Sequence, residues 1–452
     1  MPCRGLKDAG GLGEFARSGP SCGGGTSPRR LSPVNTRIAG KKVLAIVLAG
    51  GKGSRLAPLT TERAKPAVPF LGTYRLIDFS LSNLVHSGMQ DVWVVEQYLP
   101  HGLNDHLSGG RPWDLDRTRG GLVVMPPFSS PENEDGEFAQ GNAHALAQHV
   151  PLMREFAPDV VLVMSADHIY KLDYSDVIRE HVRREASVTM VTTDLEDEAQ
   201  ATRFGNVRAD GEGRVTGFAY KPDEPLGKTV TAEVFVYDAV ILMDTLEDLE
   251  RQGDLGDYGE ELLPALVARG DAYAFPLEGY WMDVGTLDAY MQTHQDFLDG
   301  KGFGLDTPDW PFITSSIARP PTRIHGSARL DHAYVCGGAE IRGEVIGSVI
   351  GPNAVVEERA SVRGSIVQPG AVVKAGARVS RAIVDQGAVV EADAVVGGQS
   401  ANSRLSVIGA RSVVESGAKV GPGLIVEPRQ TVRAGQEAEV ARPAEGDDKA
   451  GK

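Results

Sequence analysis

The pattern of apolar positions separates the chain into two kinds of region. Residues 43–49 are continuously apolar, and shorter runs of the same kind occupy 92–95 and 160–164. Such runs are typical of parallel strands that are buried on both faces. Segments of mixed polarity, such as 141–155, predict helices between them. This alternation indicates an α/β domain with a Rossmann-like, mainly parallel sheet, which we expect to span 41–305.

A different period governs the C-terminal part. Isoleucine and valine recur every six residues, as in Ile350, Val356 and Val362, and a second set begins 17 residues later at Val367. Small or turn-forming residues stand between them. Hexapeptide repeats of this kind predict a left-handed parallel β-helix, in which each coil stacks its apolar residues on the next coil. We assign this domain to residues 331–440.

Three segments carry neither pattern. Residues 1–40 are rich in Gly, Pro, Ser and Arg and predict a disordered tail, and 441–452 predict a second one. Residues 306–330 are proline-rich and predict a linker between the two domains.

Composition excludes several classes of protein. The 452 residues include 46 Lys and Arg against 61 Asp and Glu, a net charge of −15, which disfavours a general nucleic-acid binder. No apolar run is long enough to span a membrane, and the first 40 residues lack the apolar stretch of a secretory signal. The three cysteines form no CxxC pair. We therefore expect a cytoplasmic protein that uses neither membrane nor nucleic acid as a partner.

A glycine-rich loop, 50–53, follows the first apolar run. Its glycines let the backbone approach a ligand closely and turn N–H groups toward anions. Positive charge is available nearby from Lys52, Arg55, Arg63 and Lys65. Lys52 is followed by glycine rather than by Ser or Thr, so the loop is not a Walker A motif. It indicates phosphate binding, with an ordinary strand-to-helix turn as the alternative.

Several motifs together resemble one enzyme family. Residues 48–56 (LAGGKGSRL) and 63–68 (RAKPAV) resemble the signature of the sugar-1-phosphate nucleotidylyltransferases. Residues 74–83 (YRLIDFSLSN), 166–170 (ADHIY) and 280–286 (YWMDVGT) narrow the resemblance to the ADP-glucose pyrophosphorylases. The resemblance implies that an NTP and a sugar 1-phosphate react to give an NDP-sugar and pyrophosphate, with Mg²⁺ as cofactor.

The resemblance also implies roles for individual residues. Catalysis would fall to Arg55, Lys65 and Asp167, and the metal ion would be held by Asp167 and Asp283. The nucleotide would be bound by Gly50, Gly51, Gly53, Arg55, Gln97 and Gly141. Lys221 would bind the sugar phosphate.

The two aspartates also have an argument from the residues alone. Asp167 ends the apolar strand at 160–164, and Asp283 follows another strand-like segment. Ligands of parallel α/β sheets bind outside the carboxyl ends of the strands, so the two carboxylates could meet at one metal ion. The alternative is that each caps a helix or a turn. For His168 we favour a structural role over a general base, because a phosphate oxygen needs no deprotonation at pH 7.

Departures from the family pattern gather around the sugar. Tyr220 stands where the family has Glu before the sugar-phosphate lysine, and residues 231–233 (TAE) replace Ser-Met-Gly. Residues 141–145 (GNAHA) replace Gly-Thr-Ala-Asp-Ala. We expect Tyr220, Thr231 and Glu233 to shape the sugar pocket. Glu233 could restore the carboxylate lost at 220 if the two strands are neighbours; neutral drift is a further explanation.

These departures favour a cyclitol acceptor such as valienol 1-phosphate, with ATP or GTP as donor, in aminocyclitol antibiotic biosynthesis. The alternative is ADP-glucose synthesis for glycogen, and a more remote one is a non-catalytic nucleotide-sugar sensor. Acyl transfer, another function of hexapeptide proteins, is disfavoured because no histidine lies within 345–452. The family implies a homotetramer or homodimer. Glu62 stands where sugar-phosphate-activated relatives carry lysine, which predicts weak or absent activation by fructose 1,6-bisphosphate.

Overall fold

The computed structural model describes residues 37–126, 141–253, 255–315, 317–398, 400 and 403–435. The predicted tail at 441–452 lies outside these residues, as does the predicted tail at 1–40 except for its last four residues. There, Arg37–Ile38 (β1) already pairs antiparallel with the strand that follows it.

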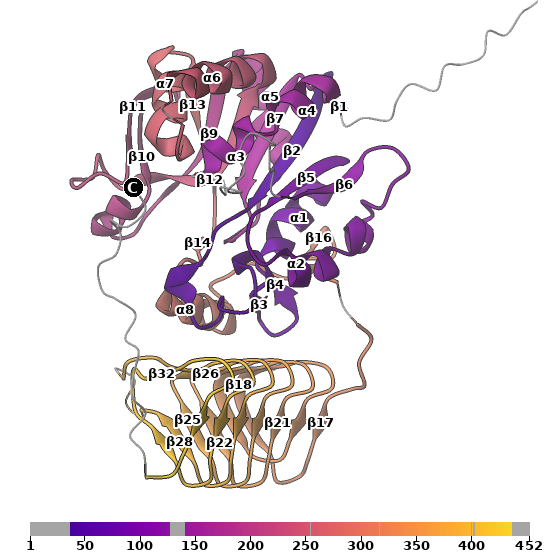
Figure 1. The fold of residues 1–452 in the computed structure, drawn as a ribbon, viewed down its shortest axis with the longest axis vertical. Coiled ribbons are helices and arrows are strands. Elements are labelled where there is room, and N and C mark those ends of the chain that lie inside the picture. Colours follow the sequence, from indigo (N-terminus) through magenta and orange to yellow (C-terminus); the bar gives the residue numbers. More distant parts are fainter. Residues whose placement is uncertain are drawn as a thin grey trace, which may run out of the picture. The chain divides into compact units, whose positions relative to one another are not determined.

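The N-terminal domain is built on one twisted sheet (Figure 1). Four of its strands run parallel in the order β7, β2, β5, β6. Beside β7 the direction reverses: β12 is antiparallel to β7 and β9, and β10 pairs antiparallel with β11 and β12. Their bounds are β2 Lys41–Ala49, β5 Asp91–Glu96, β6 Gly121–Met125, β7 Val160–Ser165, β9 Val188–Asp194, β10 Gly205–Ala209, β11 Val215–Tyr220, β12 Thr229–Asp238 and β13 Ala272–Pro276.

Helices cover both faces of this sheet (Figure 1), which confirms the predicted α/β class. Alternate residues of β2 enter different cores: Ala45 and Val47 pack with one set of helices, Leu44 and Ile46 with the other. Two-sided burial explains why β2 is continuously apolar over residues 43–49. The helices are α1 Ile77–His86, α2 Pro100–Leu107, α3 Asn142–Ala147, α4 Val150–Phe156, α5 Tyr174–Arg184, α6 Ala239–Gln252, α7 Leu263–Ala268 and α8 Leu287–Leu298.

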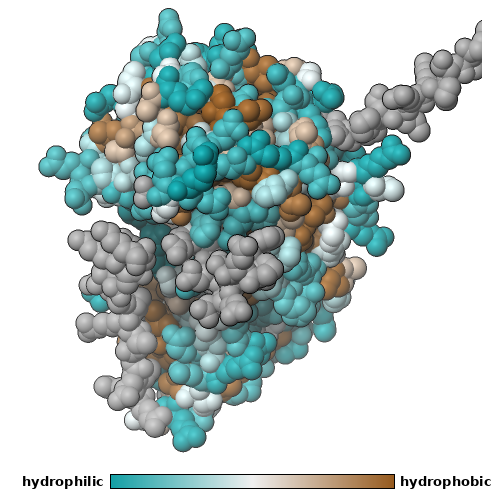
Figure 2. Space-filling view, turned by 45° about the horizontal axis from the view of Figure 1, so that its top comes forward, coloured by the Kyte–Doolittle hydropathy of each residue, from teal (hydrophilic) through white to brown (hydrophobic). Residues whose placement is uncertain are grey.

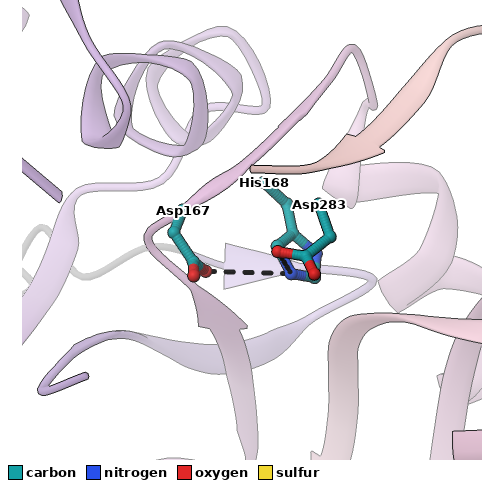
Figure 3. A group of neighbouring side chains, drawn as sticks. All are labelled: Asp167, His168 and Asp283. Carbon is teal, nitrogen blue, oxygen red and sulfur yellow. Dashed lines mark ion pairs between the residues drawn. The ribbon is translucent and has the colours of Figure 1, made fainter. Parts of the chain in front are cut away.

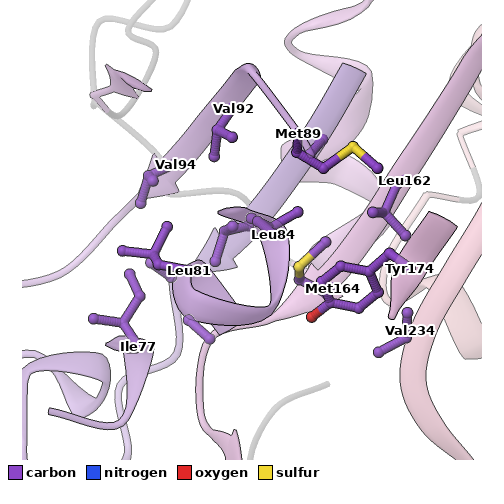
Figure 4. Packing of buried hydrophobic residues seen from close by; sticks show 14 of the residues in the cluster. Ile77, Leu81, Leu84, Met89, Val92, Val94, Leu162, Met164, Tyr174 and Val234 are labelled. Atoms are coloured by element: carbon purple, nitrogen blue, oxygen red, sulfur yellow. The ribbon is translucent and has the colours of Figure 1, made fainter. Parts of the chain in front are cut away.

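The first core lies between the sheet and helix α1. Figure 4 shows Leu81 and Leu84 of α1 facing Val92 and Val94 of β5, with Met164 of β7 close by. All five side chains are fully buried. This packing fixes the strand ends, from which the loops discussed below emerge.

The C-terminal domain is the predicted parallel β-helix. Equivalent valines stack coil on coil, as in the series Val356, Val373, Val390, Val414. From Val356 to Val390 the coils are offset by 17 residues. An insertion after Val396 then lengthens one coil, so that Val396 pairs with Val420, which explains the interruption of the repeat in the sequence. The strands are β17 Arg323–Ile324, β18 Arg329–Val335, β19 Glu340–Ile341, β20 Glu344–Ile350, β21 Val355–Val356, β22 Ser361–Arg363, β23 Ile366–Val367, β24 Val372–Val373, β25 Arg378–Ser380, β26 Ala382–Val384, β27 Val389–Val390, β28 Val395–Gly397, β29 Ser406–Ile408, β30 Val413–Val414, β31 Lys419–Val420, β32 Ile425–Val426 and β33 Thr431–Val432.

One outer face of the β-helix is apolar and packs against the N-terminal domain. Ile366 and Ile383 lie in one buried cluster with Phe70, Phe79 and Phe297. The cluster also holds Leu56 and Leu59, which follow the glycine-rich loop in the sequence. The β-helix therefore supports the segment that runs from that loop into α1.

Short paired strands complete the fold. Those bearing on the site are β8 (His168–Tyr170) and β14 (Trp281–Asp283), which form a separate antiparallel pair; the others are β3 Pro69–Phe70, β4 Tyr74–Arg75, β15 Asp306–Thr307 and β16 Trp310–Pro311. Hydrophilic residues predominate on the face shown in Figure 2, with apolar residues in smaller groups among them. No helix among the described residues is long and apolar enough to cross a membrane.

Candidate active site

The glycine-rich loop is folded tightly against the segment that carries Lys65. Gly53 has a left-handed backbone (φ 65°), and a Cβ there would lie 3.0 Å from the Lys65 Cβ. The Thr60 hydroxyl donates a hydrogen bond to the Gly53 carbonyl at 2.8 Å. Glycine is required at this position because both the backbone angle and the close approach exclude a side chain. The fold of the loop thus brings the Lys65 segment into close contact with Gly53.

Lys65, Asp167 and Asp283 form the centre of the site. The Lys65 Nζ forms an ion pair with Asp167 and lies 3.7 Å from an Asp283 carboxylate oxygen. Asp167 follows β7, while Asp283 is the last residue of β14, opposite His168 in the β8–β14 pair. The expected meeting of the two aspartates is therefore observed. Its cause differs from the one expected, because Asp283 comes from this separate pair and not from a strand end of the main sheet.

Charge balance determines the protonation of this buried cluster. Burial alone would lower the pKa of Lys65, but the carboxylates of Asp167 and Asp283 outweigh it and raise the pKa. Burial would raise the pKa of Asp167, but Lys65 and His168 hold it well below its usual value. Lys65 and Asp167 are therefore both charged at neutral pH, and the Lys65 ammonium also lies close to the carboxyl group of Asp283.

The donor set suits a divalent cation that prefers oxygen. Ligand atoms of Asp167, His168 and Asp283 lie within 4.8 Å of one another, and their side chains point toward a common space (Figure 3). Mg²⁺ takes oxygen ligands and is commonly held by one or two carboxylates, so the two aspartates fit it and the imidazole does not. The His168 Nδ1 instead lies 3.2 Å from the Ala232 carbonyl oxygen, a contact with the backbone of β12.

Glu233 reaches the cluster from an irregular point in β12. Thr231 pairs with Thr192 of β9 and Phe235 with Met190, so four steps along β12 match only two along β9. Within this bulge Glu233 has a left-handed backbone (φ 54°). Bulges re-aim side chains and are common beside active sites. Here the bulge brings a Glu233 oxygen to 3.7 Å from the His168 Nε2.

Tyr220 and Lys221 lie at the end of β11, with the tyrosine folded inward. The Tyr220 hydroxyl donates to Asp257 at 2.5 Å, and its ring lies against Gly259, where a Cβ would clash with it. The Lys221 Nζ lies over the ring, 4.6 Å from its centre, and Lys221 is exposed. β10 separates β11 from β12, so Tyr220 and Glu233 are not on neighbouring strands, contrary to the condition stated for compensation.

The remaining predicted site residues differ in their contacts and in their exposure. Gln97 packs against Gly50, where a Cβ would lie 2.9 Å from its side chain. Gly141 lies against the backbone of Gly256 and opens helix α3. Arg55 is exposed, as is Gly51. Thr231 is buried beside Gly205 and makes no contact with the cluster among those that the structure gives for the described residues.

Two neighbours of the site were not expected from the sequence. Asp257 caps the short π-helical turn Tyr258–Leu262 and accepts the Tyr220 hydrogen bond. The Tyr258 hydroxyl is hydrogen-bonded to Glu233, and burial raises its pKa well above the usual value. The glycines at 256 and 259, which bracket these residues, were the signal available: each permits a close approach by another segment.

A cluster of charges joins the Lys65 segment to the β-helix. Arg63 makes two hydrogen bonds to Asp385, at 2.9 and 3.0 Å. Glu62 pairs with both Arg411 and Arg429, the latter at 2.6 Å. Partial burial would raise the pKa of Glu62, but hydrogen bonds from the two arginines hold it below its usual value. The β-helix arginines are thus neutralised by a carboxylate only three residues from Lys65.

Comparison with known proteins agrees with this geometry. The nucleotidyl transferase family model matches residues 44–300, and a GlmU-like C-terminal hexapeptide model matches 321–407. The glucose-1-phosphate adenylyltransferase of Thermosipho melanesiensis is 40% identical over 398 residues, covering 85% of this chain and 96% of that protein. The one from Clostridium novyi is 37% identical over 319 residues, covering 70% and 83%. The one from Thermotoga maritima is 38% identical, covering 68% and 73%.

The Glu62 contacts predict how the protein responds to fructose 1,6-bisphosphate. Because the carboxylate occupies Arg411 and Arg429, a phosphorylated activator meets negative charge there, and we expect the turnover rate to change less than about twofold. Glu62→Gln should make the rate more sensitive to the bisphosphate, whereas Glu358→Gln, a change at an exposed β-helix turn, should not. Strong activation of the unmodified protein in a steady-state assay would contradict this prediction.

Proposed function

The chain belongs to the ADP-glucose pyrophosphorylase family of nucleotidyl transferases, and from that premise we propose that it joins ATP and glucose 1-phosphate into ADP-glucose and pyrophosphate. Nucleotidyl transfer onto a sugar 1-phosphate is the reaction of the family. The identity of donor and acceptor is our proposal, supported by relatives that carry this activity in their names and match most of both chains. The comparisons give no support to the cyclitol phosphate that the sequence analysis placed first.

One observation carries the proposal: a buried ammonium lies between two carboxyl groups, on a lysine whose Cβ packs closely against Gly53 of the glycine-rich loop. In the reaction, an oxygen of the sugar phosphate attacks the α-phosphorus of the nucleotide. The bond from the α-phosphorus to the bridging oxygen breaks, and pyrophosphate leaves. No proton has to be removed from the attacking phosphate, so the protein must mainly align the reactants and neutralise charge.

The residues divide this task. Backbone N–H groups of the loop 50–53 and the exposed Arg55 would hold the triphosphate. Lys65, whose pKa is raised by its two carboxylate neighbours, would neutralise negative charge at the transferring phosphoryl group. Asp167 and Asp283 would hold Mg²⁺, which when bound supplies charge neutralisation at the phosphates. His168 would have a structural role: its contact with the Ala232 carbonyl oxygen would hold the start of β8 in place next to Asp167.

The acceptor would lie between Lys221 and Glu233. Lys221 would bind the sugar phosphate, and its ammonium is held over the Tyr220 ring, which Asp257 and Gly259 fix in place. Tyr220 is therefore a positioning residue. Glu233 offers a carboxylate that can accept hydrogen bonds from ring hydroxyls, and Tyr258 holds it.

A cyclitol 1-phosphate is the second candidate acceptor. The observation that favours it is the Glu233 bulge, because a carboxylate presented by a left-handed residue costs backbone strain. Such a group distinguishes ligands by the position of their hydroxyls. GTP as donor belongs to this candidate. Homotetramer or homodimer assembly stays a prediction.

The direct test of the proposal is pyrophosphate release with Mg²⁺ across a matrix of NTPs and sugar or cyclitol 1-phosphates. We expect ATP with glucose 1-phosphate to give the highest kcat/KM, and chelation of Mg²⁺ by EDTA to abolish turnover. Selective turnover of valienol 1-phosphate, with ATP or GTP, would replace the proposal by the second candidate. Absence of turnover with every pair would contradict both.

Exchange of the two pocket residues tests their role in acceptor recognition. The double variant Tyr220→Glu, Glu233→Gly carries the side chains typical of the family. We expect at least a roughly tenfold change in the ratio of kcat/KM for glucose 1-phosphate and valienol 1-phosphate, since one charged hydrogen bond is worth about 1.5–3 kcal/mol. Thr216→Ser, an exposed change on the same strand β11, serves as control. An unchanged ratio in a folded double variant would refute the role assigned to both residues.

A further inference from the structure

A buried carboxyl group that the mechanism above does not use lies next to the glycine-rich loop. Glu96 is the last residue of β5 and is only 1% exposed. In the parallel pairing of β5 with β2, Glu96 is in register with Ala49, the residue before Gly50. Neighbouring strands lie about 4.8 Å apart, so the backbone of Glu96 is one strand spacing from the point where the loop begins. The following residue, Gln97, packs against Gly50 itself.

Only one of the two carboxyl oxygens of Glu96 has a hydrogen-bond partner among the residues that the structure describes. The Asn104 Nδ2 of helix α2 donates to Oε2 at 2.9 Å. The other oxygen, Oε1, is buried and has no partner there. Side chains alternate along a strand, so Glu96 points to the same face as Val94, toward α2. The same helix packs against the turn Lys65–Ala67.

Among the described residues, no cation stands ready to balance an ionised Glu96. Strand β2 has no charged residue over 43–49. The charged side chains of α2 and of the Lys65 segment are paired elsewhere, in the contacts His101–Asp105, His106–Asp78, Lys65–Asp167 and Arg63–Asp385. Lys52 of the loop lies over the Tyr98 ring, 5.2 Å from its centre. Burial raises the pKa of Glu96 to about 7, and the hydrogen bond from Asn104 offsets this only in part.

We propose that Glu96 controls nucleotide binding: the protonated side chain lets the loop bind a triphosphate, and the ionised side chain opposes it. A triphosphate carries several negative charges. A like charge in a buried position nearby repels it more strongly than the same charge in water would, because the effective dielectric constant is lower there. This inference rests on the proposed function, since it requires the loop to bind a nucleotide.

The direction of the pH effect follows from the pKa of Glu96. Below about pH 7 most of these carboxyl groups are protonated and neutral, and above it most are ionised. Binding of the triphosphate favours the protonated form and therefore raises the pKa of Glu96 further. By linkage, binding takes up protons near neutral pH, and the affinity for the nucleotide falls as the pH rises.

Calorimetry with MgATP tests the proton uptake. The full chain is titrated without an acceptor, in two buffers whose heats of ionisation differ, so that protons taken up on binding change the observed heat. Glu96→Gln keeps the shape of the side chain and the acceptor for Asn104 but cannot ionise. We expect the unmodified protein and Glu155→Gln, an exposed change on helix α4, to take up more protons than Glu96→Gln. Equal proton exchange by all three proteins would overturn the proposal.

The same titrations at several pH values measure the affinity. Between about pH 6.5 and about pH 8.5, we expect the Kd for MgATP to rise at least roughly threefold more for the unmodified protein than for Glu96→Gln. The reason is that each pKa unit of coupling corresponds to a tenfold change in affinity. A ratio of the two Kd values that stayed constant over this range would refute the role of Glu96.

Asn104→Ala is a second variant, at an exposed position, that keeps the test decisive if Glu96→Gln fails to fold. Loss of the Asn104 donor removes a contact that favours the charged carboxylate, so the pKa of Glu96 should rise and the fall in affinity should move to higher pH. An unchanged pH profile would contradict the proposal. If MgATP bound to none of these proteins at any pH, the proposed function would fail, and this inference with it.

Discussion

The buried ammonium of Lys65 is the interaction on which the site depends. It lies between Asp167 and Asp283, and each of these three charges would be costly to bury without the others. The contacts raise the pKa of Lys65 and lower that of Asp167, so the site holds an ammonium beside carboxylate groups that suit a divalent cation. The same chemistry that makes the cluster stable in the folded protein makes it suitable for neutralising phosphate charge.

The rest of the fold serves to bring this cluster together and hold it. Strand β7, which is buried on both faces, ends two residues before Asp167, and the separate pair β8–β14 places Asp283 beside it although the two aspartates are far apart in the sequence. The Lys65 segment is fixed from outside by the β-helix, through Arg63–Asp385, the Glu62 contacts and the apolar cluster around Phe70. The β-helix is thus part of the support of the catalytic loop as well as a domain of its own.

The sequence predicted those features whose signals are local or repeated. The run 43–49 is apolar throughout because both faces of β2 are buried, and the six-residue period of the β-helix is repeated in every coil. It did not predict the antiparallel strands beside β7, because a buried strand such as β12 has the same apolar character whichever direction it runs, and its direction depends on long-range pairing. The bulge at Glu233 depends on how β12 pairs with β9, a long-range relation that the residues 231–233 do not encode by themselves. For the same reason, the contact between Tyr220 and Asp257 was not foreseen.

The most direct test of this account is the kcat for pyrophosphate release by Lys65→Gln, measured with Mg²⁺ beside Lys171→Gln, which changes an exposed lysine next to β8. The account predicts a fall of roughly 1000-fold or more for Lys65→Gln, comparable to removal of a principal electrostatic group from an active site, and little change for Lys171→Gln. A folded Lys65→Gln protein whose kcat stayed within roughly tenfold of the unmodified enzyme would contradict it, because the central ammonium would then be dispensable.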